Sequence, residues 1–345
     1  MAALSIFFVV ALIAAVLGEV SNTAKYGYVP PKHTRAPSTA EHGAALNHAV
    51  VGFGNCKPYC ERDKLRALLP SFLATYKRKP WKENRCGCQV NHCMSSFMVA
   101  ALSRAASIVE NGVNAGMSGF LFRAAAPAAT VYHIDPLPRP ICDPERQRWR
   151  DPGLSYYLTG DNFTDFAQVD WSRAGLNKKE TLVFFDTHQP DARIVADAIE
   201  NGFSTFLLDD NYPAVDPNDM QDLSLKTVFA KNASEAKHLY RLLNFYFEMP
   251  PLINPLDAPH SLRTKYPQVF TQPAECRNGR RKHCNLRIDA ADQALGLVQS
   301  PLLNLHDPTD ASLFETVMSS GAVQPMEFWW YNHMAVLGAK PRRAF

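Results

Sequence analysis

Five short apolar runs in the middle of the chain constrain the fold more than any other feature of this sequence. They lie at residues 107–109, 130–134, 155–158, 181–185 and 205–208. Helix-like stretches separate several of them, at residues 117–126, 163–169 and 191–201. Apolar strands that alternate with helices are typical of a parallel sheet with helices on both faces. The sequence therefore predicts an α/β fold with a Rossmann-like, doubly wound and mostly parallel sheet.

Each apolar run is followed by an acidic segment. The acids are Glu110, Asp135, Asp161, Asp186, Asp209 and Asp210. Open α/β sheets bind their ligands at the carboxyl ends of the strands. One acid at such a position is commonly a helix cap, whereas five strand ends with acids are hard to explain as caps alone. The pattern therefore predicts a ligand site along this edge of the sheet.

A glycine-containing loop follows the first run, with Gly112, Gly116 and Gly119. Glycines at a strand-to-helix turn let the backbone approach a ligand and direct a helix N-terminus toward it. The spacing is G-x₃-G-x₂-G, which differs from the G-x-G-x-x-G of dinucleotide sites. A tight turn packed on the sheet explains the same glycines equally well.

Five segments of the sequence together resemble a known family. They read IVENGVNAG-x-SG, IDP, TGDNFTDF, FFDTHQ and DDNYP. In this combination the chain resembles class I S-adenosylmethionine-dependent methyltransferases, and among them the macrocin O-methyltransferase and cephalosporin hydroxylase-like branch. The resemblance covers about residues 80–230. It implies an O-methyltransferase that uses S-adenosylmethionine and acts on a small-molecule or glycan acceptor.

The resemblance also implies a role for individual residues. The methionine end of the cofactor would be lined by Glu110, Gly112 and Gly116, and the other cofactor-binding residues beside it would be Asn114 and Ser118. Asp135 would hold the ribose hydroxyls. The adenine would be flanked by Asp161 and Phe163.

A divalent cation is implied by the same resemblance. Its expected ligands are Asp186, Asp209 and Asp210. Carboxylate oxygens suit Mg²⁺, which could hold a vicinal diol and lower the pKa of the hydroxyl to be methylated. We expect Asp186 and His188 to be catalytic, with His188 as a general base because histidine titrates near neutral pH. A capping or packing role for His188 is an equally good interpretation.

The N-terminal residues predict entry into the secretory pathway. Residues 1–18 are apolar or small from Leu4 to Leu17, about the length of a signal-peptide core and shorter than the roughly 20 residues that span a bilayer. A short type II membrane anchor and a buried helix are the alternatives.

The remaining chain divides into three predicted parts. Residues 19–80 form an irregular and helical arm, residues 81–250 the Rossmann-like domain, and residues 251–345 an irregular extension. We expect helices at residues 61–77, 92–105 and 233–247, and an aromatic strand or hairpin at residues 327–337.

The eight cysteines favour disulfides, since their number is even and the expected compartment is oxidising. Cys276 and Cys284 bracket a basic loop, where a local bridge is plausible. A zinc site at Cys86, Cys88, His92 and Cys93 is the alternative, but C-x-C lacks the spacing of zinc knuckles.

Two sequons, at Asn162 and Asn232, predict a glycoprotein. We expect the glycan at Asn232, because Asn162 falls within the stretch assigned to adenine.

The balance of charge argues against nucleic acid as a partner. Lys and Arg number 36, Asp and Glu 33, and the formal net charge is +3. Nucleic-acid binding normally requires a concentrated basic face. Two other functions remain open: a nicotinamide-dependent oxidoreductase on the same fold, and a secreted binding protein without catalytic activity.

Overall fold

The computed structural model of the chain describes residues 52–81, 88–140, 147–187, 191–211, 224–231, 233–273, 299–329 and 333–341. These residues belong to one compact unit, which spans residues 45–345. Several predictions lie outside the described residues. They concern residues 1–18, His188, Asn232 and the cysteines Cys86, Cys142, Cys276 and Cys284.

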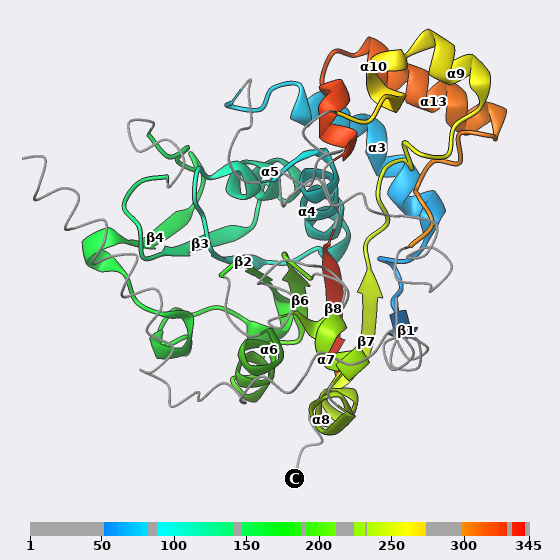
Figure 1. The fold of residues 1–345 in the computed structure, drawn as a ribbon. Coiled ribbons are helices and arrows are strands. Elements are labelled where there is room, and N and C mark those ends of the chain that lie inside the picture. Colours follow the sequence, from blue (N-terminus) through cyan, green and yellow to red (C-terminus); the bar gives the residue numbers. More distant parts are fainter. Residues whose placement is uncertain are drawn as a thin grey trace, which may run out of the picture. The chain divides into compact units, whose positions relative to one another are not determined.

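A mixed sheet of eight strands forms the centre of this unit, in the order β1-β7-β8-β6-β5-β2-β3-β4 (Figure 1). The strands are β1 (Gly52–Gly54), β2 (Ser107–Asn111), β3 (Thr130–Asp135), β4 (Ser155–Thr159), β5 (Thr181–Phe185), β6 (Thr205–Leu208), β7 (Leu243–Glu248) and β8 (Ala335–Ala339). Strands β2 to β6 pair with one another in parallel. Strand β8 is antiparallel to both β6 and β7, and β1 is antiparallel to β7. The predicted Rossmann-like α/β fold is confirmed.

Helices cover both faces of the sheet. They are α3 (Arg62–Tyr76), α4 (Val90–Ser103), α5 (Met117–Ala125), α6 (Asp191–Glu200), α7 (Leu225–Lys231), α8 (Ala233–Leu242), α9 (His260–Lys265), α10 (Pro267–Phe270) and α13 (Pro308–Ser319). Side chains alternate between the two faces of a strand. In β5, Phe184 therefore packs in the core that contains α3, α4, α5 and α13, and Phe185 packs in the core that contains α6, α7 and α8. This division makes the sheet doubly wound.

The chain order of the parallel strands creates a switch point between β2 and β5. From β2 the chain proceeds outward to β3 and β4, and then returns to the other side of β2 to form β5 and β6. Loops that leave β2 and β5 therefore diverge, and ligands of open α/β sheets bind in the crevice between such loops. A ligand site is therefore expected at the end of β2.

The prediction of a helix over residues 233–247 is wrong for its last third. Helix α8 ends at Leu242, and β7 begins at Leu243. The residues from Phe245 to Phe247 alternate between the two cores, since Phe245 and Phe247 pack with one core and Tyr246 with the other. Aromatic residues favour strands over helices. Similarly, only a 3-10 turn, Phe166–Gln168, occupies the helix predicted over residues 163–169.

The predicted aromatic strand is also corrected. Residues Pro325–Trp329 form a 3-10 helix, and β8 starts only at Ala335. Trp329 is buried, and its Nε1 donates a hydrogen bond to the carbonyl oxygen of Val269 at 2.7 Å. The aromatic side chains therefore pack beside the C-terminal helices, and the strand itself consists of small and aliphatic residues.

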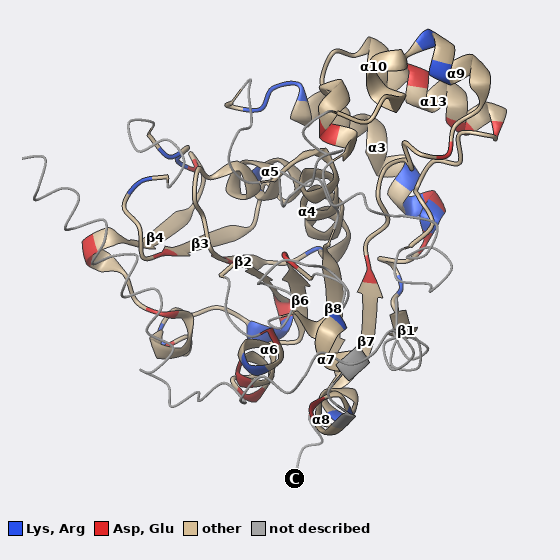
Figure 2. Cartoon of the chain, viewed as in Figure 1, with Lys and Arg blue, Asp and Glu red and all other residues tan. Residues whose placement is uncertain are grey.

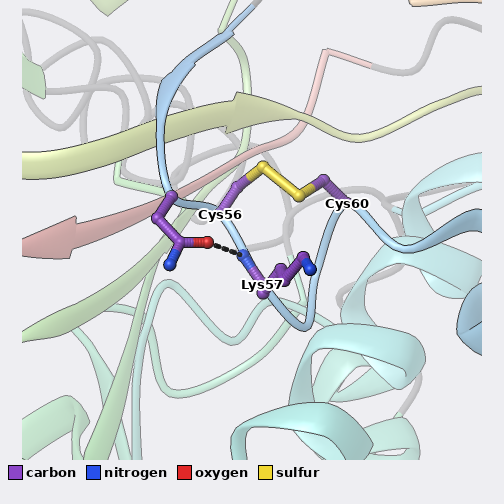
Figure 3. Close-up of a disulfide and its surroundings, with 4 residues drawn as sticks. Cys56, Lys57 and Cys60 are labelled. Carbon is purple, nitrogen blue, oxygen red and sulfur yellow. Dashed lines mark hydrogen bonds between the residues drawn. A yellow bond between two sulfur atoms is a disulfide. The ribbon is translucent and has the colours of Figure 1, made fainter.

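Four cysteines lie among the described residues. Cys56 and Cys60 form a disulfide that closes a short turn (Figure 3). Cys88 and Cys93 are buried, reduced thiols, so the expectation that the cysteines form disulfides holds for one pair and is wrong for these two.

Among the described residues, no helix has the length and apolar character that crossing a membrane requires. Charges of both signs occur on α6 and on α8 (Figure 2).

Candidate functional site

The acids at the carboxyl ends of the strands differ in their exposure to solvent. Glu110, Asp135 and Asp209 are buried, Asp186 is half-buried, and Asp161 is exposed. The predicted series of acids therefore lies along one edge of the sheet, but its members have different surroundings.

Glu110 belongs to a buried hydrogen-bonded network. Ser118 Oγ donates to one carboxylate oxygen of Glu110, and Nδ1 of His133 contacts the other. Nε2 of His133 lies 3.8 Å from Oδ2 of Asp151, and the His133 ring stacks on Tyr157 with centroids 4.4 Å apart. Burial alone would lower the pKa of His133, but hydrogen bonds to Asp151 and Glu110 raise it above its ordinary value. The structure thus brings Glu110 and Ser118 together as partners of each other.

Asp135 fixes the shape of the loop after β2. Its Oδ2 accepts the backbone N–H groups of Val113 at 3.0 Å and Asn114 at 2.7 Å, and its Oδ1 accepts that of Leu137 at 2.8 Å. Asn114 adopts a positive φ of 44° in this loop. The predicted residues Asn114 and Asp135 are therefore in direct contact.

The two loop glycines are required by contacts within the chain itself. Gly112 has a φ of +102°, and a Cβ at this position would lie 2.0 Å from the carbonyl oxygen of Asp186. Gly116 has a φ of +83°, and its Cβ would lie 2.8 Å from the carbonyl oxygen of Trp149. Both positions therefore exclude larger residues without any ligand. The interpretation of these glycines as a tight, packed turn is sufficient.

Arg148 and Trp149 cover this loop. Nη2 of Arg148 lies 3.1 Å from Oδ2 of Asp135, and its Nε donates to the carbonyl oxygen of Asn114 at 2.7 Å. The backbone N–H of Trp149 donates to the carbonyl oxygen of Ala115 at 3.0 Å. Asp135 thus accepts three backbone N–H groups and forms an ion pair with Arg148, whose Nη2 also donates to the carbonyl oxygen of Leu137 at 2.9 Å. A ribose hydroxyl bound at Asp135 would displace Arg148 from the carboxylate.

Asp161 and Phe163, the predicted adenine contacts, follow β4. Asp161 is in the 3-10 turn Gly160–Asn162, and Phe163 is 38% exposed. Asn162, one of the two sequon asparagines, is also exposed. The structure therefore places an accessible aromatic ring and acid at the end of β4, as expected from the sequence.

Asp209 lies against two residues from another part of the chain. Its Oδ1 is 3.2 Å from Nδ1 of His92, and one ligand atom each from Cys88, His92 and Asp209 lie within 4.8 Å of one another. Burial would lower the pKa of His92, but the charge of Asp209 raises it well above the ordinary value. A hydrogen bond to Cys93, together with burial, raises the pKa of the Cys88 thiol.

The Mg²⁺ ligands expected from the sequence do not form this group. Among the described residues, the cluster with converging ligand atoms contains Asp209 but neither Asp186 nor Asp210. Asp210 has a φ of +54°, and its backbone N–H donates to Oδ1 of Asp209 at 2.8 Å. A thiol and an imidazole are poor partners for Mg²⁺, which prefers oxygen ligands. The three-aspartate site stays a prediction, and this cluster does not fit it.

A second buried polar network lies beside the end of β7, and the sequence did not predict it. Nζ of Lys226 pairs with a carboxylate oxygen of Glu248, both side chains being less than 9% exposed. The hydroxyl of Tyr246 donates to Glu248 at 2.7 Å and accepts from Asn211 Nδ2 at 2.7 Å. Burial and the charges of Lys226 and His92 lower the pKa of nearby His333 well below its ordinary value. The one sequence signal for this network is a carboxylate at the end of an otherwise apolar strand.

Among the comparisons with known proteins, only the comparison with solved structures found similar proteins. No protein-family profile matches the chain, and neither does any curated protein sequence. An S-adenosylhomocysteine-bound methyltransferase of Podospora anserina, PaMTH1, is 14% identical, with 62% of this chain and 92% of that chain covered and a TM-score of 0.34. A putative O-methyltransferase from Klebsiella pneumoniae is 13% identical, with 52% and 80% covered and a TM-score of 0.32. Cofactor-bound Rv0187 from MTB is 15% identical, with 58% and 85% covered and a TM-score of 0.31. Similarities this distant carry no functional inference.

Proposed function

We propose that this protein is an S-adenosylmethionine-dependent O-methyltransferase. The observation that carries the proposal is Asp135, which ends the second parallel strand beside the switch point and is hydrogen-bonded to the loop after β2. Nucleotide-binding α/β folds place the acceptor for the ribose hydroxyls at this position. In the proposed site Asp135 binds the ribose, Glu110, Gly112, Asn114, Gly116 and Ser118 lie at the methionine end, and Asp161 and Phe163 lie beside the adenine.

Two features argue against the nicotinamide-dependent alternative. The loop from Gly112 to Gly119 has the wrong glycine spacing for a dinucleotide. In addition, the strand beside β6 is the antiparallel β8, whereas the dinucleotide fold has a sixth parallel strand there. Both support a mononucleoside cofactor over NAD.

The proposed acceptor is a hydroxyl group of a sugar or another small molecule in the secretory pathway. The disulfide between Cys56 and Cys60 supports an oxidising compartment, where such bonds persist. In this proposal Asp186 and His188 act on the acceptor hydroxyl, and a divalent cation assists.

The test is binding of S-adenosylhomocysteine to the purified chain, measured by calorimetry, with NAD as the competing candidate. We expect binding of S-adenosylhomocysteine and none of NAD. Asp135→Ala should weaken the binding of S-adenosylhomocysteine by about 1–3 kcal/mol, the cost of a lost buried hydrogen-bond partner.

Asp170→Ala is the matched control. Asp170 also accepts two backbone N–H groups, at 3.1 and 3.2 Å, but in an exposed turn. Equal affinity of wild type and Asp135→Ala would remove Asp135 from the site, and binding of NAD alone would overturn the proposal.

A further inference from the structure

Cys88, His92 and Asp209 form a compact cluster that ties the start of α4 to the end of β6. Cys88, His92 and Asp209 are 4%, 4% and 7% exposed as whole residues, so the cluster is closed to bulk water. Their ligand atoms lie within 4.8 Å of one another. A tetrahedral ion with bonds of about 2.0–2.3 Å to sulfur, nitrogen and oxygen brings its ligand atoms to separations within this range.

Local structure holds Cys88 beside the first turn of α4, in which His92 lies. Cys88 precedes the helix, and its carbonyl oxygen accepts a hydrogen bond from Sγ of Cys93 at 3.1 Å. The backbone N–H of Cys93 donates to the carbonyl oxygen of Gln89 at 2.8 Å, so the helical turn is already formed there.

Asp209 is directed to this point by the end of β6. Its backbone N–H donates to the carbonyl oxygen of Phe185 at 2.9 Å, which holds it in line with the parallel strands. The next residue, Asp210, takes a left-handed conformation and donates its N–H to the Asp209 side chain. Oδ1 of Asp209 therefore contacts both the backbone N–H of Asp210 and Nδ1 of His92.

The same residue types could instead form a nucleophilic thiol relay. Such a relay passes a proton through the imidazole, with the thiol and the carboxylate on opposite ring nitrogens. Here one ligand atom from each residue lies within 4.8 Å of the other two, and the thiol is closed to solvent. This arrangement suits a shared ion better than a proton relay.

We propose that Cys88, His92 and Asp209 bind a divalent transition-metal ion, with Zn²⁺ the best match. Thiolate and imidazole ligands select zinc-like ions, and a carboxylate oxygen is a further zinc ligand. The ion would also compensate the negative charge of a buried thiolate and a buried carboxylate. This inference does not depend on the methyltransferase proposal, because metal binding is measured without a methyl donor.

The test is a titration of the purified, metal-free full chain with Co²⁺ as a spectroscopic substitute for Zn²⁺. We expect one equivalent to bind, with a thiolate-to-cobalt charge-transfer band that Zn²⁺ abolishes and excess Mg²⁺ does not. Cys88→Ser should lose the band. His92→Gln and Asp209→Asn should each weaken Co²⁺ binding at least about tenfold. Loss of a residue that only hydrogen-bonds to a metal ligand already lowers metal affinity by about tenfold or more, so loss of a ligand should have at least this effect.

Cys93→Ser is the matched control, since Cys93 is a second buried, reduced thiol on the same helix. Cys93→Ser should retain the cobalt charge-transfer band. If Cys93→Ser loses the band while Cys88→Ser keeps it, the proposal is overturned. Absence of stoichiometric binding in wild type would overturn it as well.

A measurement on wild type alone keeps the inference testable if the variants do not fold. X-ray absorption of the zinc-loaded chain should show one sulfur neighbour and otherwise nitrogen or oxygen. A first shell without sulfur, or with two or more sulfurs, would contradict the assignment of these three ligands.

Discussion

The guanidinium of Arg148 forms an ion pair with Asp135, with Nη2 3.1 Å from Oδ2. Both side chains are less than 10% exposed, so little of the ion pair is in contact with water. The acid that ends the second parallel strand is therefore already paired within the chain. A ligand that uses this acid must compete with Arg148, and this competition can be measured.

Arg148→Ala should raise the affinity for S-adenosylhomocysteine, because it removes the cation that is paired with Asp135. We expect an increase of up to about tenfold, or about 1.4 kcal/mol. Calorimetry of wild type and variant measures it. Arg150→Ala is the control, since the exposed Arg150 lies over the Tyr157 ring and not at Asp135. A lower affinity in Arg148→Ala would mean that Arg148 orders the site instead of competing for it.

Gly112→Ala should destabilise the fold more than Gly175→Ala. Both glycines have positive φ, +102° and +71°, so each substitution carries a backbone strain of about 1–3 kcal/mol. Only at Gly112 does the new methyl group also collide with backbone, the Asp186 carbonyl oxygen. Gly175 has nothing within 4 Å of its Cβ position. Urea unfolding of the two variants gives the comparison, and equal losses would contradict the close approach at Gly112.

Lys226→Met should cost about 3–5 kcal/mol of unfolding free energy, because it leaves the Glu248 carboxylate buried without its cation. Lys265→Met removes an ion pair to Glu315 whose side chains are 55% and 37% exposed, and it should have little effect. Denaturant unfolding distinguishes the two. A small effect of Lys226→Met would contradict the requirement of the buried Glu248 carboxylate for this cation.

The His133 network should make stability depend on pH. The pKa of His133 in the folded chain is raised above its ordinary value of 6.5, so its contribution is fully present below that value. The contribution is lost as the pH rises through the folded value. His133→Gln should flatten the fall in unfolding free energy on the alkaline side of about 6.5. His92 has a raised pKa of the same sign, so only the difference between wild type and variant reports on His133. Parallel curves would exclude His133 as a source of the dependence.

The central part of the fold could be predicted because its signals are local. Strands β5 and β6 occupy the residues expected, since an uninterrupted apolar run such as Thr181–Phe185 reports its own burial on both faces. Strand β7 was missed because Leu243–Glu248 continues a helical pattern, and its position next to β8 depends on residues far away in the chain. Only tertiary pairing decides between helix and strand for such a segment.

The candidate site shows the same division. Asp135 could be assigned to the end of β3, because position along a strand is a local property. The contact between His92 and Asp209 could not, since it requires the packing of α4 against the end of β6. The pairing of Asp135 with Arg148 was likewise not predictable, because Arg148 belongs to an irregular segment between β3 and β4.

The insertion of β8 between β6 and β7 has a consequence for biosynthesis. The ribosome releases the parallel strands and β7 long before Ala335–Ala339, yet β7 and β1 join the rest of the sheet only through β8. Until this segment has left the ribosomal tunnel, β6 and β7 each present an open hydrogen-bonding edge, of the kind that nascent chains must keep from pairing wrongly. Closure of the sheet therefore requires translation to proceed past Ala339, and a ribosome that stalls shortly before Ala335 leaves a nascent chain with two unpaired edges.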